Sequence, residues 1–241
     1  MDREAHRVQA DDYITWKTWD RRPFATPDAW YRAFFRAELA KAGTMSFRDA
    51  LEVGFGNGEF LAYARDRGIL VVGIDTNEAL VDIARRAGFD AYAALSEVPL
   101  ERLFDLVVAF DVLEHMAQDL IPRVLTDLRS RLRPGGVLIA RFPNGDSPFS
   151  RASQYGDVTH QTVIGSHMAR YFAQTTGFDV EYCGPTSLPV LGAPLHKAAY
   201  AVVVRPLRWA IDKFLALVYL QRTDITFTNT LTVVLRKPTE Q

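Results

Sequence analysis

The stretch Leu51-Glu52-Val53-Gly54-Phe55-Gly56-Asn57-Gly58-Glu59-Phe60 decides the fold of this 241-residue chain. The apolar run 49–53 predicts a strand, the glycines predict a tight turn, and residues 59–67 predict a helix that begins at once. Glycines accept positive φ and let a ligand approach the backbone closely. The next predicted strand, 70–74, is followed by Asp75, an acid that can accept hydrogen bonds from sugar hydroxyls. A glycine loop followed about 20 residues later by an acid is typical of a Rossmann-type unit.

Outward from this stretch, predicted strands alternate with predicted helices. The strands are 49–53, 70–74, 89–93, 104–110, 137–142, 178–183 and 225–235, and the helices are 59–67, 78–87, 118–132, 165–176 and 195–222. Pro134-Gly135-Gly136 predicts a turn and residues 143–164 a loop. A further helix through Lys41, capped by Asp28 or Thr26, precedes the first strand. Apolar strands that alternate with helices predict a parallel sheet covered on both faces.

Composition narrows the class of protein. Lys plus Arg is 28 and Asp plus Glu is 29, so the chain lacks the basic excess of nucleic-acid-binding proteins, and we expect no nucleic-acid partner. Cys183 is a single cysteine, which predicts neither a disulfide nor a zinc cluster. The charged start and the absence of an apolar run of about 20 residues argue against a signal peptide and a spanning helix. We expect a cytoplasmic location, with peripheral contact at the inner face of the membrane left open.

The spacing of the glycines favours S-adenosylmethionine (SAM) over a dinucleotide as the ligand. Gly54-x-Gly56-x-Gly58 lacks the second residue that dinucleotide-binding loops place before the third glycine. Glu52 at the end of the first strand would repel a pyrophosphate but can face a sulfonium-bearing amino acid. For the glycines alone, a tight strand–helix turn without a ligand is the alternative.

Four motifs in order resemble class I SAM-dependent methyltransferases over about residues 45–183. Residues 51–60 resemble motif I, 72–75 motif II, 104–115 motif IV of the small-molecule branch, and 132–138 the motif that opens the fifth strand. The resemblance implies an α/β fold with a Rossmann-like, seven-stranded, mostly parallel sheet, an antiparallel last strand and helices on both faces. It implies an N-terminal arm and helix over 1–44, and a methyltransferase domain over 45–241 with a helical insertion at 185–223 before the last strand.

The resemblance also implies the cofactor contacts. Glu52 and the loop would hold the amino-acid part of SAM, Asp75 the ribose, and Ala94 and Leu95 the adenine. The full implied cofactor set is Glu52, Gly54, Phe55, Gly56, Asn57, Gly58, Asp75, Thr76, Ala94, Leu95, Phe110, Asp111 and His115. For His115, local packing at the start of a helix is the alternative.

A hydroxyl acceptor has a high pKa and needs a general base, which is most often histidine near neutral pH. His160, in the loop after the fifth strand, is our candidate, with Asp157 to orient its ring. Capping of the following helix is the alternative role for His160. Motif IV has no paired carboxylates with metal-like spacing, so we predict no metal. His196, at the start of the insertion, is a candidate substrate contact.

Features of both ends of the chain bear on the acceptor. The segment with Tyr13, Trp16 and Trp19 and the tail 228–238 resemble methyltransferases of bacterial surface polysaccharide and lipopolysaccharide biosynthesis. Aromatic faces suit sugar rings, although these residues can equally pack the arm onto the sheet. The leading hypothesis is O-methylation of a saccharide, either a glycan or its lipid- or nucleotide-linked precursor. The alternatives are methylation of a quinone-like or other lipophilic small molecule, and a non-catalytic SAM-binding module of a glycan assembly complex.

The insertion predicts an amphipathic helix that begins near Pro206. Leu207, Ile211, Phe214 and Val218 recur at helical spacing and form an apolar face, with cations such as Arg205 beside it. Four roles fit such a helix: packing on its own sheet, a substrate cap, a homodimer contact, or contact with an anionic membrane. Among the functional roles, we expect the cap.

Overall fold

A computed structural model describes residues 15, 17, 23–43, 46–221 and 225–239. Its strands form one seven-stranded sheet in the order β3-β2-β1-β4-β5-β7-β6. The strands are β1 (Asp49–Val53), β2 (Leu70–Ile74), β3 (Asp90–Tyr92), β4 (Phe104–Phe110), β5 (Leu132–Pro143), β6 (Asp179–Pro185) and β7 (Thr230–Arg236). β7 runs antiparallel to both β5 and β6, whereas the pairs among β1 to β5 are parallel. The predicted fold class and the antiparallel last strand are confirmed.

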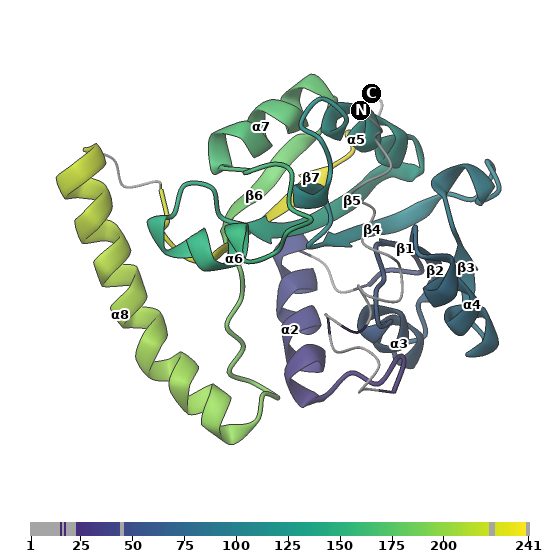
Figure 1. Ribbon diagram of the computed structural model, residues 1–241, viewed down its shortest axis with the longest axis horizontal. Coiled ribbons are helices and arrows are strands. Elements are labelled where there is room, and N and C mark those ends of the chain that lie inside the picture. Colours follow the sequence, from purple (N-terminus) through teal and green to yellow (C-terminus); the bar gives the residue numbers. More distant parts are fainter. Residues whose placement is uncertain (1–14, 16, 18–22, 44–45, 222–224, 240–241) are drawn as a thin grey trace.

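Helices cover both faces of the sheet (Figure 1). The helices α5 (Ile121–Ser130) and α7 (Ser166–Thr175) share one apolar core with the sheet, which includes Leu125 and Phe172. On the opposite face lie α2 (Ala29–Leu39), extended by the 3-10 helix η2 (Ala40–Ala42), α3 (Glu59–Asp66) and α4 (Glu78–Arg86). The parallel strands β1, β2 and β4 are buried on both faces and therefore consist largely of apolar residues.

Three predicted boundaries were wrong. β5 begins at Leu132, which pairs with Phe104 of β4, and the register shifts before Val137. Within the predicted turn, Gly135, at φ +76°, donates its N–H to the Lys237 carbonyl. The predicted loop 143–164 contains the 3-10 helix η5 (Pro148–Ser150) and the short helix α6 (Arg151–Tyr155). Pro206 lies inside the helix α8 (Leu195–Leu220) instead of starting it.

Helix α8 lies at the edge of the molecule, outside the layered body (Figure 1). Only Ala201 and Ala216 of its 26 residues are buried. The predicted apolar face points to solvent: Leu207 is 56% exposed, Phe214 64% and Val218 54%. Packing of this face on the sheet is therefore contradicted. Among the described helices, none combines the length and the hydropathy needed to cross a bilayer.

Candidate active site

The glycine loop lies between β1 and α3, and all three of its glycines have positive φ. The φ angles are +68° at Gly54, +51° at Gly56 and +75° at Gly58. A Cβ atom on Gly54 would meet the Val112 side chain at 2.6 Å, and one on Gly58 would meet the Phe24 ring at the same distance. Both the backbone conformation and the space therefore require glycine at these two positions.

Asp75, which follows β2, organises the loop from the neighbouring strand end. Its carboxylate accepts hydrogen bonds from the backbone N–H of Gly56 at 3.0 Å and of Asn77 at 2.9 Å. Burial raises the pKa of Asp75, although these two hydrogen bonds oppose the rise. A carboxylate offers about four lone-pair positions, so Asp75 retains acceptors for a diol after making both bonds. Thr76 beside it is exposed.

Glu52 is a buried acid at the end of β1. Glu52 is 5% exposed, and its Oε2 atom has no hydrogen-bond partner among the described residues. Burial raises the pKa of Glu52 well above its usual range, and the nearby carboxylates of Glu59 and Asp75 raise it further. Glu52 accepts a hydrogen bond from the Leu61 backbone N–H, but a buried carboxylate oxygen without a partner is costly unless a cation or a donor reaches it. This property fits a ligand that brings an ammonium or sulfonium group to the loop.

Two of the loop residues that we assigned to the cofactor are engaged within the protein. Phe55 is buried and packs edge-on against Phe24, with a ring separation of 6.2 Å. Asn57 donates its side-chain amide to the Pro23 carbonyl at 3.3 Å, and its own carbonyl accepts the N–H of Ala25 at 2.8 Å. Both side chains hold the segment that precedes α2 against the loop.

The segment after β3 is held by an arginine that the sequence analysis missed. Ala94 and Leu95 are half-buried at the start of the 3-10 helix η3 (Leu95–Glu97). Arg131 is 5% exposed and donates to the carbonyls of Leu95, Val98 and Pro99 at 2.7 to 3.0 Å. A buried arginine that binds several carbonyls could have been suspected only after the fold was known, because 36 residues separate it from Leu95.

The end of β4 carries a strained residue. Asp111 has φ +57°, which is uncommon for a non-glycine residue and is often found at functional sites. Its carboxylate pairs with Arg141 at the end of β5, a second residue that the sequence analysis missed. Phe110 beside it packs in an aromatic cluster with Phe34, Phe35 and Phe60.

His115, Asp157 and His160 meet beside the end of β4. The rings of His115 and His160 lie edge to face with centroids 4.7 Å apart. Asp157 forms an ion pair with Lys17 at 2.7 Å and accepts the Thr159 hydroxyl at 2.5 Å. Burial raises the pKa of Asp157, but the hydrogen bonds from Lys17 and Thr159 outweigh this effect and hold the pKa at about 2.

The orientation of His160 differs from our expectation. Its Nδ1 donates to the Gln154 carbonyl at 2.9 Å, whereas Asp157 lies 3.8 Å from Nε2 and does not hold the ring. A carbonyl can only accept, so in the neutral ring the hydrogen is on Nδ1 and the lone pair is on Nε2. Burial lowers the pKa of His115, and the neighbouring His160 lowers it further, which favours a neutral ring.

The predicted substrate contacts are not brought together in the described structure. Tyr13, Trp16 and Trp19 lie outside the described residues, although Lys17 between them reaches Asp157. His196 is exposed in the first turn of α8, outside the histidine cluster. Glu114, which the sequence analysis did not single out, is buried between Leu113 and His115 in the 3-10 helix η4 (Leu113–His115).

Comparisons with known proteins identify the family of the chain. A family model described as a methyltransferase domain matches residues 28–182, more than half of the chain. A probable S-adenosylmethionine-dependent methyltransferase of Mycolicibacterium smegmatis is 29% identical over 161 residues, which are 65% of this chain and 62% of that relative. The matched region thus spans less than two thirds of the relative's length.

Solved structures share the fold. A SAM-dependent methyltransferase from Archaeoglobus fulgidus aligns with a TM-score of 0.60 and 19% identity, covering 86% of this chain and 94% of its own. The 1,6-didemethyltoxoflavin-N1-methyltransferase of Burkholderia thailandensis, solved with its substrate and S-adenosylhomocysteine, aligns with a TM-score of 0.59 and 16% identity. That alignment covers 99% of this chain and 93% of the other.

Proposed function

The chain belongs to the methyltransferase-domain family, and from this premise we propose that it transfers a methyl group from SAM to a hydroxyl group of a saccharide. The observation that carries the choice of a hydroxyl acceptor is the lone pair on His160 Nε2 beside the end of β4. SAM supplies a methyl group that its sulfonium already activates, so the protein has to align the acceptor and remove its proton.

We assign the cofactor to the edge formed by the glycine loop, Asp75 and the segment after β3. The unpartnered Oε2 atom of Glu52 faces the charged amino-acid part, and the free lone pairs of Asp75 accept the ribose hydroxyls. Ala94 and Leu95 lie beside the adenine. Ligands of this kind bind at the carboxyl ends of parallel strands.

We assign proton removal to His160. Nε2 accepts the hydroxyl proton while the oxygen attacks the methyl carbon, and the bond from carbon to sulfur breaks to leave S-adenosylhomocysteine. The Gln154 carbonyl stabilises the ring in both states, because Nδ1 keeps its hydrogen throughout. The His160 side chain is 8% exposed, which limits competition from water.

We assign the acceptor to the side of the site where Lys17 meets Asp157. The sequence places Lys17 between Trp16 and Trp19, in a segment whose aromatic side chains suit sugar rings. This contact supports the earlier assignment of Tyr13, Trp16 and Trp19 to the substrate.

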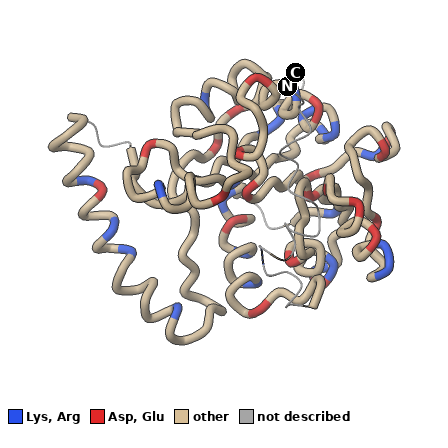
Figure 2. The backbone as a smooth tube through the Cα atoms, viewed as in Figure 1, with Lys and Arg blue, Asp and Glu red and all other residues tan. Residues whose placement is uncertain are grey.

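We further propose that the saccharide is linked to a lipid and that α8 binds the surface of an anionic membrane. The solvent-facing side of α8 is apolar, and the helix carries four cations, Lys197, Arg205, Arg208 and Lys213, against Asp212 (Figure 2). The helix is therefore positive in a chain whose net charge is -1. An exposed apolar face with adjacent cations fits an anionic lipid surface better than a cap over the site. Pairing with a second copy is the competing outcome.

The first prediction tests the hydroxyl acceptor. Purified protein with methyl-labelled SAM should label a saccharide hydroxyl in a screen of glycan extracts, lipid-linked sugars and quinone precursors. His160→Ala should lower turnover about 10²- to 10⁴-fold through loss of the general base. It should leave S-adenosylhomocysteine affinity unchanged in calorimetry.

His167→Ala, at an exposed position on α7, is the control and should keep full turnover. Labelling of a quinone precursor instead of sugars would refute the saccharide. Normal turnover of the His160 variant would refute its role as the base.

A further inference from the structure

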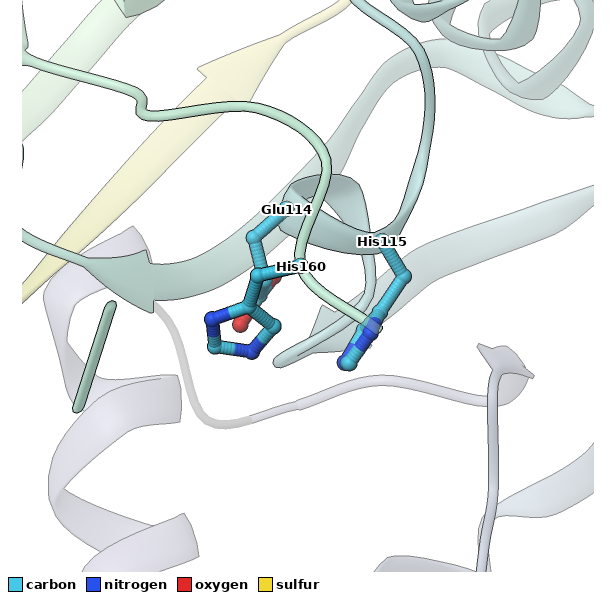
Figure 3. Close-up of side chains that lie close together, drawn as sticks. All are labelled: Glu114, His115 and His160. Carbon is cyan, nitrogen blue, oxygen red and sulfur yellow. The ribbon is translucent and has the colours of Figure 1, made fainter. Parts of the chain in front are cut away.

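We propose that Glu114, His115 and His160 form a binding site for a divalent first-row transition-metal ion such as Zn²⁺ or Mn²⁺. One ligand atom from each residue lies within 4.8 Å of those of the other two. Figure 3 shows the three side chains converging from η4 and from the loop that follows α6. This inference rests on the proposed function in one respect, the hydroxyl acceptor. It departs from the sequence-based prediction of no metal, and it makes His160 a metal ligand instead of the base when the ion is bound.

Hydrogen bonds orient both imidazoles as a metal requires. The Thr159 hydroxyl gives its hydrogen to Asp157, so its oxygen must accept the hydrogen of His115 Nδ1, 2.8 Å away. His160 Nδ1 donates to the Gln154 carbonyl. Both Nε2 atoms are therefore left with a lone pair. Histidines that bind metals almost always donate their other ring N–H to a carbonyl, carboxylate or water in this way.

Glu114 supplies the carboxylate ligand. Burial, together with the nearby Asp111, raises the pKa of Glu114 to about 8, so the ion displaces a proton from Glu114 as it binds. Glu114 is 1% exposed, and its Oε2 has no hydrogen-bond partner among the described residues. A buried carboxylate oxygen without a partner is costly, and a cation would satisfy it. Figure 3 shows the Glu114 carboxylate beside the His160 ring.

The ligand set defines the class of ion. Two imidazoles and one carboxylate suit first-row transition metals, whereas Mg²⁺ and Ca²⁺ prefer oxygen ligands. Metal–ligand bonds of about 2.0–2.2 Å place ligand atoms within about 4.4 Å of one another. A small rotation of the side chains therefore closes the site. Three protein ligands leave at least one position open for the acceptor.

The ion changes how the acceptor is activated. A hydroxyl oxygen in the open position loses its proton to solvent more easily, because the cation lowers its pKa. The oxygen then forms its bond to the methyl carbon while the bond from that carbon to sulfur breaks. In the metal-bound protein, the His160 lone pair is a ligand, so the ion replaces His160 as the proton-removing device.

The test is calorimetry of the full chain, after treatment with a chelator and its removal, against ZnCl₂ and MnCl₂. We expect one ion per chain for one or both metals. Glu114→Gln and His115→Gln should each weaken binding at least about 10-fold, and Thr159→Val should weaken it about 10- to 100-fold through loss of the outer hydrogen bond. His167→Gln, at an exposed position, is the matched control and should bind as wild type does.

The melting temperature, measured by circular dichroism on the same samples, shows that each variant is folded. No metal binding by the wild type, or equal binding by the folded Glu114→Gln variant, overturns the site. Saccharide methylation that a chelator does not slow overturns the catalytic role of the ion and leaves the proposed function standing. Metal binding that depends on Glu114, without any hydroxyl acceptor, overturns the proposed function and leaves the site standing.

Discussion

We expect the charge state of Glu52 to be coupled to cofactor binding, because Glu52 is buried in the strand that leads into the glycine loop. Burial and two neighbouring carboxylates raise its pKa well above the ordinary value of 4.5. Between the ordinary and the raised pKa, Glu52 is therefore protonated in the folded protein and ionised in the unfolded chain. A cationic ligand reverses this preference, because it stabilises the ionised carboxylate.

Glu52→Gln should show this coupling in two measurements. In the wild type, the stabilising contribution of Glu52 to the free energy of unfolding is fully present below the ordinary pKa of the unfolded chain. This contribution falls as the pH rises toward the raised pKa of the folded protein. The neutral variant should lack this fall, so its melting temperature should decline less between about pH 5 and 8. SAM affinity should rise with pH in the wild type and be lower and flat in the variant. Identical pH slopes for the two proteins would contradict the assignment.

Helix α8 is an element whose amphipathicity was predictable and whose orientation was not. The spacing of its apolar residues predicted one face, but that face points away from the body. The body-facing side buries Ala201 and Ala216. It also makes polar contacts, including a hydrogen bond from Thr226 to Asp212 and the Lys197 ammonium 4.7 Å from the Trp30 ring centroid. A helix oriented in this way leaves its apolar surface free for a lipid bilayer.

Phe214→Asp should abolish flotation with vesicles of anionic lipid. The wild type should float at low salt and less at high salt, because screening weakens the cationic contribution. Phe214 is 64% exposed, so its replacement should change the free energy of unfolding by no more than about 0.5 kcal/mol.

The matched control is Leu100→Asp, at a position 81% exposed and far from α8 in sequence, which should float as the wild type does. The membrane proposal would be wrong if the wild type never floats and sediments as a dimer that Phe214→Asp dissociates. In that case the partner of α8 would be a second copy of the chain.

At the scale of the whole molecule, Glu38 joins three parts that are distant in sequence. Its carboxylate in α2 accepts from Lys41 at 2.9 Å, from the Ser187 N–H at 2.6 Å and from the Thr232 hydroxyl of β7 at 2.7 Å. It is fully buried, and these partners satisfy both oxygens. The N-terminal helix, the last strand and the start of the insertion are thus fixed to one another.

Glu38→Ala should lower the free energy of unfolding by about 3–5 kcal/mol, because removal of one partner leaves a largely buried ammonium group uncompensated. Urea denaturation followed by circular dichroism measures this change, and Glu101→Ala at an exposed position is the control. A loss below about 1 kcal/mol would show that Glu38 contributes no more than a surface pair does.

Local sequence patterns were enough to predict the central strands and the pairing of a glycine loop with an acid. β1, β2 and β4 lie at the residues predicted for them, because continuous apolar runs bounded by glycines and acids leave little choice of element. The contact of Asp75 with Gly56 joins the two features that first indicated the unit, a loop and an acid at a fixed spacing.

The polar contacts between distant segments and the direction in which α8 faces could not be predicted from local sequence patterns. Arg131, Arg141 and Glu38 bind groups 30 or more residues away, so no local pattern marks them. The pairing of His115 with His160 depends on how the loop after β5 folds back onto the end of β4. Periodicity shows that a helix has an apolar face, but the contacts of its flanking segments decide whether that face meets the core or the solvent.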